Sequence, residues 1–185
     1  MEQKIAFMGV SGAGKDYLAK YLVENHDYIR FSFSDQLKRI ASLIYPWLEQ
    51  DYPPIMKEEP LQKPLSTGET ITMSPRQIWL HLNSLRDVEK HIFIRMLEEQ
   101  IQRSNSSKND RRILVTDVRS NDEFEWCKKN NFTVVYIETT GNVYKSYEID
   151  AHILKNKNRA NLKFINKHNG LSDFEEFYNL EINNS

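Results

Sequence analysis

Hydrophobic and polar positions follow two different periods along the chain. Short, mostly apolar runs are typical of strands that are buried on both faces of a sheet. Such runs lie at residues 4–8, 113–116, 133–137 and 164–165, and residues 28–33 show the apolar–polar alternation of a further strand. Between them, apolar residues recur every three or four positions, which predicts helices. Strands that alternate with helices in this way predict βαβ units and one parallel sheet with helices on both faces.

Polar residues and proline indicate where the predicted helices begin and end. Helical spacing is clearest over residues 15–24 and 88–103. Ser34 or Asp35 is expected to cap the helix that follows the second strand, and Pro46 is expected to end it. A capping box, with serine first and Gln or Glu three positions later, opens three further helices. These boxes lie at residues 74–77, 120–123 and 172–175.

Residues 47–73 follow neither period, and they contain four prolines. Structureless stretches of that length are uncommon inside compact domains. The segment therefore predicts either a long functional loop or a short helical insertion.

The composition is that of a charge-rich globular chain. Of 185 residues, 39% are hydrophobic and 28% are charged, and the formal net charge is −1. This length suggests about one domain, and the near-neutral charge argues against a dedicated duplex-DNA binder. The single cysteine, Cys127, excludes an intramolecular disulfide and a cysteine-based zinc cluster. Without a signal-peptide pattern or a run of about 18 apolar residues, the sequence predicts a cytoplasmic protein with no membrane partner.

Residues 9–15 read Gly-Val-Ser-Gly-Ala-Gly-Lys and fit the phosphate-loop pattern G-x-x-x-x-G-K. In this pattern backbone N–H groups surround a phosphate, and the lysine reaches the β- and γ-phosphates of a nucleotide. The next residue is usually Ser or Thr, which binds Mg²⁺, but here it is Asp16. A plain glycine-rich turn is the alternative, although three of the six glycines lie in this one segment. The residues expected to contact ATP here are Gly9, Ser11, Gly12, Ala13, Gly14, Lys15, Asp16 and Tyr17.

Five segments carry a wider resemblance. They are Gly14-Lys15-Asp16, residues 31–38, residues 74–77, Thr116-Asp117-Val118-Arg119 and residues 164–171. Together they resemble the phage-type deoxynucleoside monophosphate kinases, over nearly the whole chain and in the family's order. The animal-type phosphomevalonate kinases share the Gly-Lys-Asp loop and are the nearest rival. The chain departs from the first family at Asp122, where the family usually has Asn, and in the late loop, where only His152 of a His-x-Ser-Glu segment is present.

The resemblance implies an α/β fold, the three-layer fold of the P-loop nucleoside monophosphate kinases, with a parallel sheet of about five strands. It implies a single domain over residues 1–185, with an acceptor-binding insertion around 47–103 and a candidate lid around 140–162. The implied activity transfers the γ-phosphoryl group of ATP to a deoxynucleoside monophosphate with the help of Mg²⁺. The implied partners are small-molecule nucleotides and not nucleic acid; a homodimer is allowed, and a phage origin would place the protein in the host cytoplasm. A phosphomevalonate-type kinase and a nucleotide-binding switch without kinase activity remain as alternatives.

Phosphoryl transfer depends mainly on positioning and on neutralising charge, which suggests roles for a few residues. Lys15 is expected to bridge the β- and γ-phosphates. Asp117 ends a predicted strand at the sheet edge where such folds bind ligands, and is expected to hold Mg²⁺ through water or to orient the acceptor. A helix cap or an ion pair with Arg119 is the alternative for Asp117. Asp16 is the second expected metal residue, and by resemblance Asp35 is a third catalytic residue near the reacting oxygens.

The resemblance assigns a further set of residues to the acceptor. Arg76 and Arg86 carry guanidinium groups that suit bidentate recognition of phosphate. Phe33 or Trp79 could stack on the base, with an ordinary place in the core as the alternative. The basic run at 155–159, in which Arg159 is an expected ATP contact, is either part of a lid or a solvated face. The full acceptor set is Phe33, Asp35, Lys38, Arg76, Trp79, Arg86, Asp117 and Arg119.

Overall fold

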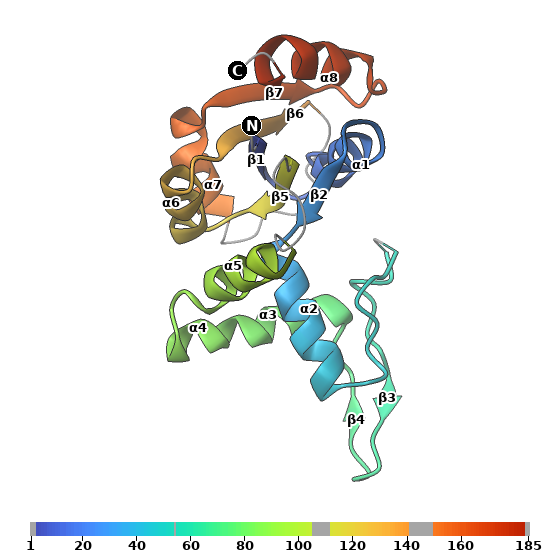
Figure 1. The fold of residues 1–185 in the computed structure, drawn as a ribbon. Coiled ribbons are helices and arrows are strands. Elements are labelled where there is room, and N and C mark those ends of the chain that lie inside the picture. The colour runs from blue at the N-terminus through green and yellow to red at the C-terminus, as the bar shows by residue number, and fades with distance from the viewer. Residues whose placement is uncertain (1–2, 54, 105–111, 141–149, 184–185) are drawn as a thin grey trace. The chain divides into compact units, whose positions relative to one another are not determined.

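The computed structural model describes residues 3–53, 55–104, 112–140 and 150–183. The chain divides into two compact units (Figure 1). The first unit consists of Met1–Ser32 and Glu99–Ser185, and the second is the continuous segment Phe33–Glu98. Most of the insertion predicted around 47–103 therefore falls in the second unit, which begins earlier, at Phe33. Of the predicted lid, residues 141–149 lie outside the described residues.

A parallel sheet of five strands forms the centre of the first unit, in the order β2-β5-β1-β6-β7. The strands are β1 (Gln3–Met8), β2 (Tyr28–Phe31), β5 (Arg112–Val118), β6 (Thr133–Thr139) and β7 (Leu162–Asn166). The first strand of the chain is thus the central one, and it pairs with β5 on one side and β6 on the other. This confirms the predicted α/β fold with a parallel sheet of about five strands.

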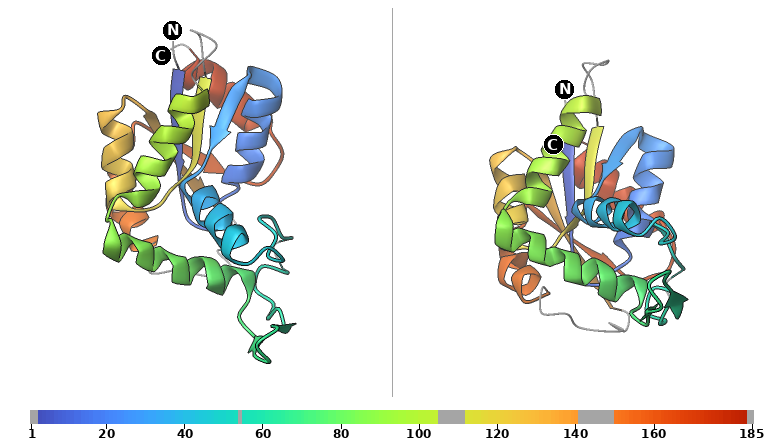
Figure 2. Two further views of the ribbon diagram at one scale, coloured as in Figure 1. Left: turned by 60° about the horizontal axis from the view of Figure 1, so that its bottom comes forward. Right: turned by 90° about the horizontal axis from the view of Figure 1, so that it is seen from below.

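Helices cover both faces of this sheet (Figure 2). They are α1 (Lys15–His26), α6 (Asn121–Lys129), α7 (Asp150–Asn156) with the 3₁₀ turn η3 (Lys157–Arg159), and α8 (Ser172–Phe177) with the π-helical turn η4 (Tyr178–Ile182). Helices α1 and α8 pack on one face through a buried cluster that includes Leu18, Phe174 and the strand residue Phe7. Helix α6 packs near β6 with Phe124 and Cys127 buried. Both faces of the sheet are therefore shielded from water, which explains the continuous apolar runs of the strands.

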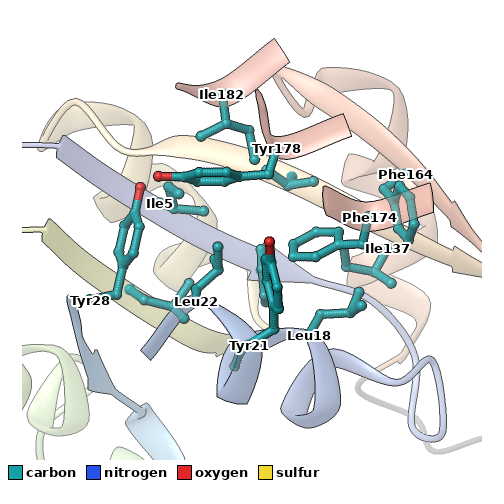
Figure 3. Packing of buried hydrophobic residues seen from close by; sticks show 14 of the residues in the cluster. Ile5, Leu18, Tyr21, Leu22, Tyr28, Ile137, Phe164, Phe174, Tyr178 and Ile182 are labelled. Carbon is teal, nitrogen blue, oxygen red and sulfur yellow. The ribbon is translucent and has the colours of Figure 1, made fainter. Parts of the chain in front are cut away.

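Buried tyrosines extend this cluster towards the start of the strands (Figure 3). The hydroxyl ends of Tyr28 and Tyr178 point toward one another, and burial raises the pKa of Tyr28. The Arg112 guanidinium donates to Tyr178 Oη at 3.4 Å and to the carbonyl of His26 at 3.1 Å. Hydrogen bonding of this kind lets polar side chains be buried without a large desolvation cost.

The second unit contains helices and one small hairpin. Its elements are α2 (Phe33–Ile44), β3 (Lys63–Pro64), β4 (Thr70–Ile71), α3 (Pro75–His81), the 3₁₀ turn η1 (Leu82–Ser84) and α4 (Leu85–Val88). Helix α5 (Ile92–Ser104) runs across the division between the units. The second unit's own core includes Ala41, Leu48, Ile78 and Trp79. The described part of segment 47–73 is thus a loop with a short antiparallel hairpin and not a helical insertion.

Two of the three predicted capping boxes are confirmed, at Ser74–Gln77 and at Ser120–Glu123. The third is wrong, because α8 begins at Ser172 with Leu171 before it and without a side-chain cap. Glu175 hydrogen-bonds the Tyr21 hydroxyl of α1 and does not turn back to the helix start. Across the described residues, no helix combines the length and the apolar character needed to cross a membrane.

The start of α2 also differs from the prediction. Strand β2 ends at Phe31 and α2 already begins at Phe33, so Ser34 and Asp35 lie inside the first turn and not at its cap. The Ser32 hydroxyl before the helix donates instead to Asp117. The predicted end is correct, since α2 stops at Ile44, two positions before Pro46.

Candidate active site

The glycine-rich loop at residues 9–14 joins the central strand β1 to the start of α1. Gly12 and Gly14 have φ angles of 81° and 85°, in the left-handed region that glycine adopts without strain. Gly9 is required for another reason, because a Cβ atom there would lie 2.6 Å from the carbonyl oxygen of Ile137 in β6. The Ala13 N–H closes the loop by donating to the carbonyl of Val10 at 3.2 Å. The chain thus forms a compact turn in front of a helix N-terminus, a backbone arrangement that suits anions.

Lys15 turns back over this loop. Its side chain is only 7% exposed, and Nζ donates to the carbonyls of Gly9 at 2.7 Å and Val10 at 2.8 Å. Burial, together with the smaller effect of the nearby positive charge of Arg119, lowers the pKa of this ammonium to about 8. A buried cation that lies beside a second cation is poised to accept a negatively charged ligand.

Three carboxylates act in the opposite direction on Lys15. Asp16, Asp117 and Asp150 all raise its pKa through their charges, in that order of size. Asp117, the predicted end of its strand, lies one position before the end of β5, which continues to Val118. Its buried carboxylate accepts a hydrogen bond from Ser32 Oγ at 2.8 Å. Because β2, β5 and β1 are parallel neighbours, Ser32, Asp117 and the loop lie at the same edge of the sheet.

Arg119 adds a buried donor whose charge acts on Lys15. Its backbone N–H donates to the carboxylate of Glu123 at 2.9 Å, within the cap of α6. Its Nε atom is buried and has no hydrogen-bond partner among the residues that the structure describes. Because an unsatisfied buried donor is costly, an anionic oxygen from a ligand would stabilise this side chain.

Mg²⁺ takes oxygen ligands and usually binds through one or two carboxylates together with substrate phosphates and water. Within the described chain no three His, Cys, Asp or Glu side chains come together to form a metal site. The two residues predicted for the metal, Asp16 and Asp117, both lie in the electrostatic surroundings of Lys15. Carboxylates beside a phosphate-type loop are the type of ligand that Mg²⁺ takes together with substrate phosphates.

The remaining residues predicted to contact ATP differ in their surroundings. Tyr17 is exposed in the first turn of α1. Arg159 forms an ion pair with Glu125 at 2.7 Å, donates to Asn156 Oδ1 at 2.8 Å and lies over the ring of Phe124. The described end of the predicted lid is therefore attached to α6.

The acceptor residues predicted in the second unit form one cluster and two separate contacts. Lys38 Nζ lies 3.7 Å from Asp35, 3.1 Å from Asp51 and over the ring of Trp79. The cluster joins three of the predicted residues, and Trp79 is also a core residue of this unit.

Arg76, Arg86 and Phe33 of the predicted acceptor set make other contacts. Arg76 forms an ion pair with Glu58, and the guanidinium of Arg86 lies over the ring of Phe93 at 4.9 Å. Phe33 is buried.

Comparison with known proteins supports the fold alone. No family model matches the chain, and no curated protein matches it. A solved structure, the crystal structure of TT1252 from Thermus thermophilus, is similar with a TM-score of 0.52. The two chains are 16% identical, and the match covers 94% of this chain and 93% of that one. The chain shares the fold of TT1252.

Sequence reasoning missed two residues beside the loop. The Asn166 side chain donates from Nδ2 to the carbonyl of Ala13 at 2.9 Å, and Asp150 is a buried carboxylate near Lys15. Asn166 stands at the carboxyl end of the last predicted strand, and that position was the available signal. Asp150 carries no local sequence signal.

Proposed function

We propose that the protein transfers the γ-phosphoryl group of ATP to a deoxynucleoside monophosphate and so forms ADP and the deoxynucleoside diphosphate. The observation that carries this proposal is the loop at residues 9–14 with the buried ammonium of Lys15 folded over it. The segments that resemble the phage-type kinases support the choice of acceptor. ATP as the donor fits a cytoplasmic enzyme.

In the reaction, an oxygen of the acceptor monophosphate attacks the γ-phosphorus, and the bond to the β–γ bridging oxygen breaks. Lys15 exchanges the carbonyls of Gly9 and Val10 for phosphate oxygens and stabilises the charge that moves to the leaving ADP. Asp117 and Asp16 would hold Mg²⁺, which when bound would supply positive charge against the β- and γ-phosphates. Asp35, Lys38, Arg76 and Arg86 of the second unit contact the acceptor.

An ATP-coupled assay tests this proposal with a panel of deoxynucleoside and ribonucleoside monophosphates that also includes phosphomevalonate. ADP release that depends on one or more deoxynucleoside monophosphates is the expected result. Release with phosphomevalonate alone would replace the acceptor and keep the kinase. Slow ADP release that no acceptor accelerates would instead identify a nucleotide-binding switch.

The rate should depend on pH through Lys15. Its pKa of about 8 in the free protein means that the ammonium loses its proton as the pH rises through this value. Because kcat/KM reports on the free enzyme, kcat/KM for ATP should fall about tenfold per pH unit above that point. Bound phosphates favour the charged amine, so kcat should fall only at higher pH. Rates at saturating acceptor from pH 6.5 to 10, about the range of this titration, give both kcat and kcat/KM for ATP. Activity measured again after return to neutral pH controls for unfolding.

Asp16 should affect the metal and not only the helix start. Replacing it with alanine is expected to raise several-fold the Mg²⁺ concentration for half-maximal rate, because a carboxylate ligand is lost. Asp16→Ser restores the usual hydroxyl and should recover part of the activity. If Asp16 only favours the helix dipole, both variants lose about 0.3–1 kcal/mol of stability and keep the wild-type Mg²⁺ curve.

Arg76→Ala should weaken acceptor binding without changing ATP binding. Loss of a charged phosphate contact in a desolvated site costs about 2–4 kcal/mol, so the acceptor KM should rise at least about tenfold. Arg86→Ala is expected to act in the same direction. Arg95→Ala is the matched control, because Arg95 forms a similar ion pair with Glu89 in the same unit and has no predicted ligand. A higher KM for ATP with an unchanged acceptor KM would reverse the assignment.

A further inference from the structure

Asn166 lies between the phosphate loop and the turn that follows the last strand. Its side chain is only 3% exposed, at the carboxyl end of the edge strand β7. The amide nitrogen Nδ2 donates to the carbonyl of Ala13 at 2.9 Å, and Oδ1 accepts the N–H of His168 at 3.0 Å. One buried amide therefore joins two backbone segments that lie more than a hundred residues apart in the sequence.

The bond to Ala13 determines which way one peptide group of the loop faces. In a trans peptide the C=O and the following N–H point in opposite directions. Because Asn166 holds the Ala13 carbonyl, the N–H of Gly14 points away from Asn166. Such N–H groups are the ones with which a loop of this type binds phosphate. Asn166 can thus orient a phosphate donor although it is not itself in the loop.

The packing at Gly14 supports the same relation. A Cβ atom on Gly14 would overlap Asn166 Nδ2 and would lie 3.4 Å from the ring of His168. Gly14 also has a φ angle of 85°, which disfavours any other residue. The turn is fixed in its own right, because His168 has a φ angle of 57° and its Nε2 lies 2.7 Å from Thr139 Oγ1. The loop and the turn therefore pack together, and the Asn166 side chain connects them.

We propose that Asn166 is a positioning residue of the ATP site, which sets the Ala13–Gly14 peptide for phosphate binding and couples the loop to the turn at residues 166–170. The inference rests on the proposed function for its ligand, ATP. The effect of Asn166 on the loop does not depend on that function and can be measured in the protein without ligand.

Asn166→Asp separates the two hydrogen bonds of this side chain. An aspartate keeps an acceptor for the His168 N–H, so the turn is retained, but it has no N–H to give to Ala13. We expect the KM for ATP to rise about tenfold or more, from the lost bond and from the added negative charge near the phosphates. The acceptor KM should stay within about twofold of the wild type, which is too small a change to indicate a lost contact. Asn166→Ala should raise the ATP KM as well.

Asn161→Ala is the matched control. Asn161 precedes the same strand at its other end, where its Oδ1 accepts from the N–H of Val134 and from Lys128 Nζ, both at 3.0 Å. This variant removes comparable hydrogen bonds just before β7, at the end of the strand opposite Asn166. It should lower the melting temperature and leave both KM values as in the wild type. An ATP KM that is equally raised in Asn161→Ala and Asn166→Asp would mean general destabilisation and would overturn the inference.

Amide hydrogen exchange in the protein without ligand gives the second readout. The hydrogen bonds from the Ala13 N–H to Val10 and from the Leu18 N–H to Gly14 report on the loop and on the start of α1. Exchange at these amides should be faster in Asn166→Asp than in the wild type and unchanged in Asn161→Ala. If the wild type neither binds nor uses ATP, the proposed function fails, yet faster exchange still supports Asn166 as the residue that positions the loop. Unchanged exchange, or an unchanged ATP KM in an active enzyme, overturns the inference.

Discussion

Replacing Lys15 with alanine is expected to lower kcat by several orders of magnitude while the protein stays folded. The ammonium is the buried cation closest to the loop carbonyls, and a preorganised charge on the transferring phosphoryl group is among the largest contributions to such a reaction. Burial of a charged amine opposes folding, so its removal should not unfold the chain. The measurement is kcat at saturating ATP and acceptor, with circular dichroism to verify the fold.

Lys20→Ala is the control for this variant. Lys20 lies on the same helix, α1, but is exposed and pairs with Glu24 at 3.6 Å. An exposed pair of this kind contributes about 0–1 kcal/mol to stability, so neither the rate nor the fold should change noticeably. A Lys15→Ala enzyme within about tenfold of the wild type would show that the loop does not stabilise the transition state.

Asp117→Asn is expected to have the second largest effect, a fall in kcat of about 10²–10³, comparable with the loss of one strong electrostatic contact in an active site. Asparagine keeps the shape of the side chain and an oxygen for the Ser32 hydroxyl, so the change removes mainly the negative charge. If the carboxylate holds Mg²⁺, the Mg²⁺ requirement should rise together with the fall in kcat. A fall in kcat with an unchanged Mg²⁺ requirement would instead indicate that Asp117 orients the acceptor.

Two control variants test whether the fall in kcat comes from the charge of Asp117 itself. Ser32→Ala removes the hydrogen bond to Asp117 and keeps the charge, so it should cost about tenfold or less. Glu138→Gln removes a carboxylate in β6 that pairs with Lys163 at 2.8 Å on the surface. It should leave kcat unchanged. Equal losses in Asp117→Asn and Glu138→Gln would mean that the general charge balance of the protein, and not the position of Asp117, determines the rate.

The sequence predicts the elements whose ends depend on local chemistry. The boxes at Ser74 and Ser120 and the stop before Pro46 are correct, because a cap or a missing N–H acts within a few residues. The start of α2 and the cap of α8 are not predicted. In both cases a side chain that could cap the helix bonds a distant partner instead: Ser32 bonds Asp117, and Glu175 bonds Tyr21.

The residues of the candidate site also differ in whether the sequence predicts them. Lys15 and the glycines are predictable because a contiguous pattern of seven residues forms the loop. Asp117 is predictable from its place near the end of a strand, since the carboxyl ends of parallel strands share one edge. Asn166 contacts the loop, and the charge of Asp150 acts on Lys15, only because the chain folds β7 and α7 toward it. No spacing in the sequence records that approach.

The discontinuous first unit has a consequence for how the chain folds. During synthesis residues 1–32 are made well before β5 and β6, the two strands with which β1 pairs. Gln3 therefore cannot pair with Arg112 until β5 has been made. The second unit is continuous and can fold in the meantime, as segments with local contacts do. Closing the sheet around its central strand is then the slow, non-local step. Because Asn166 belongs to β7, the loop after β1 reaches its final shape only after residue 166 has been made.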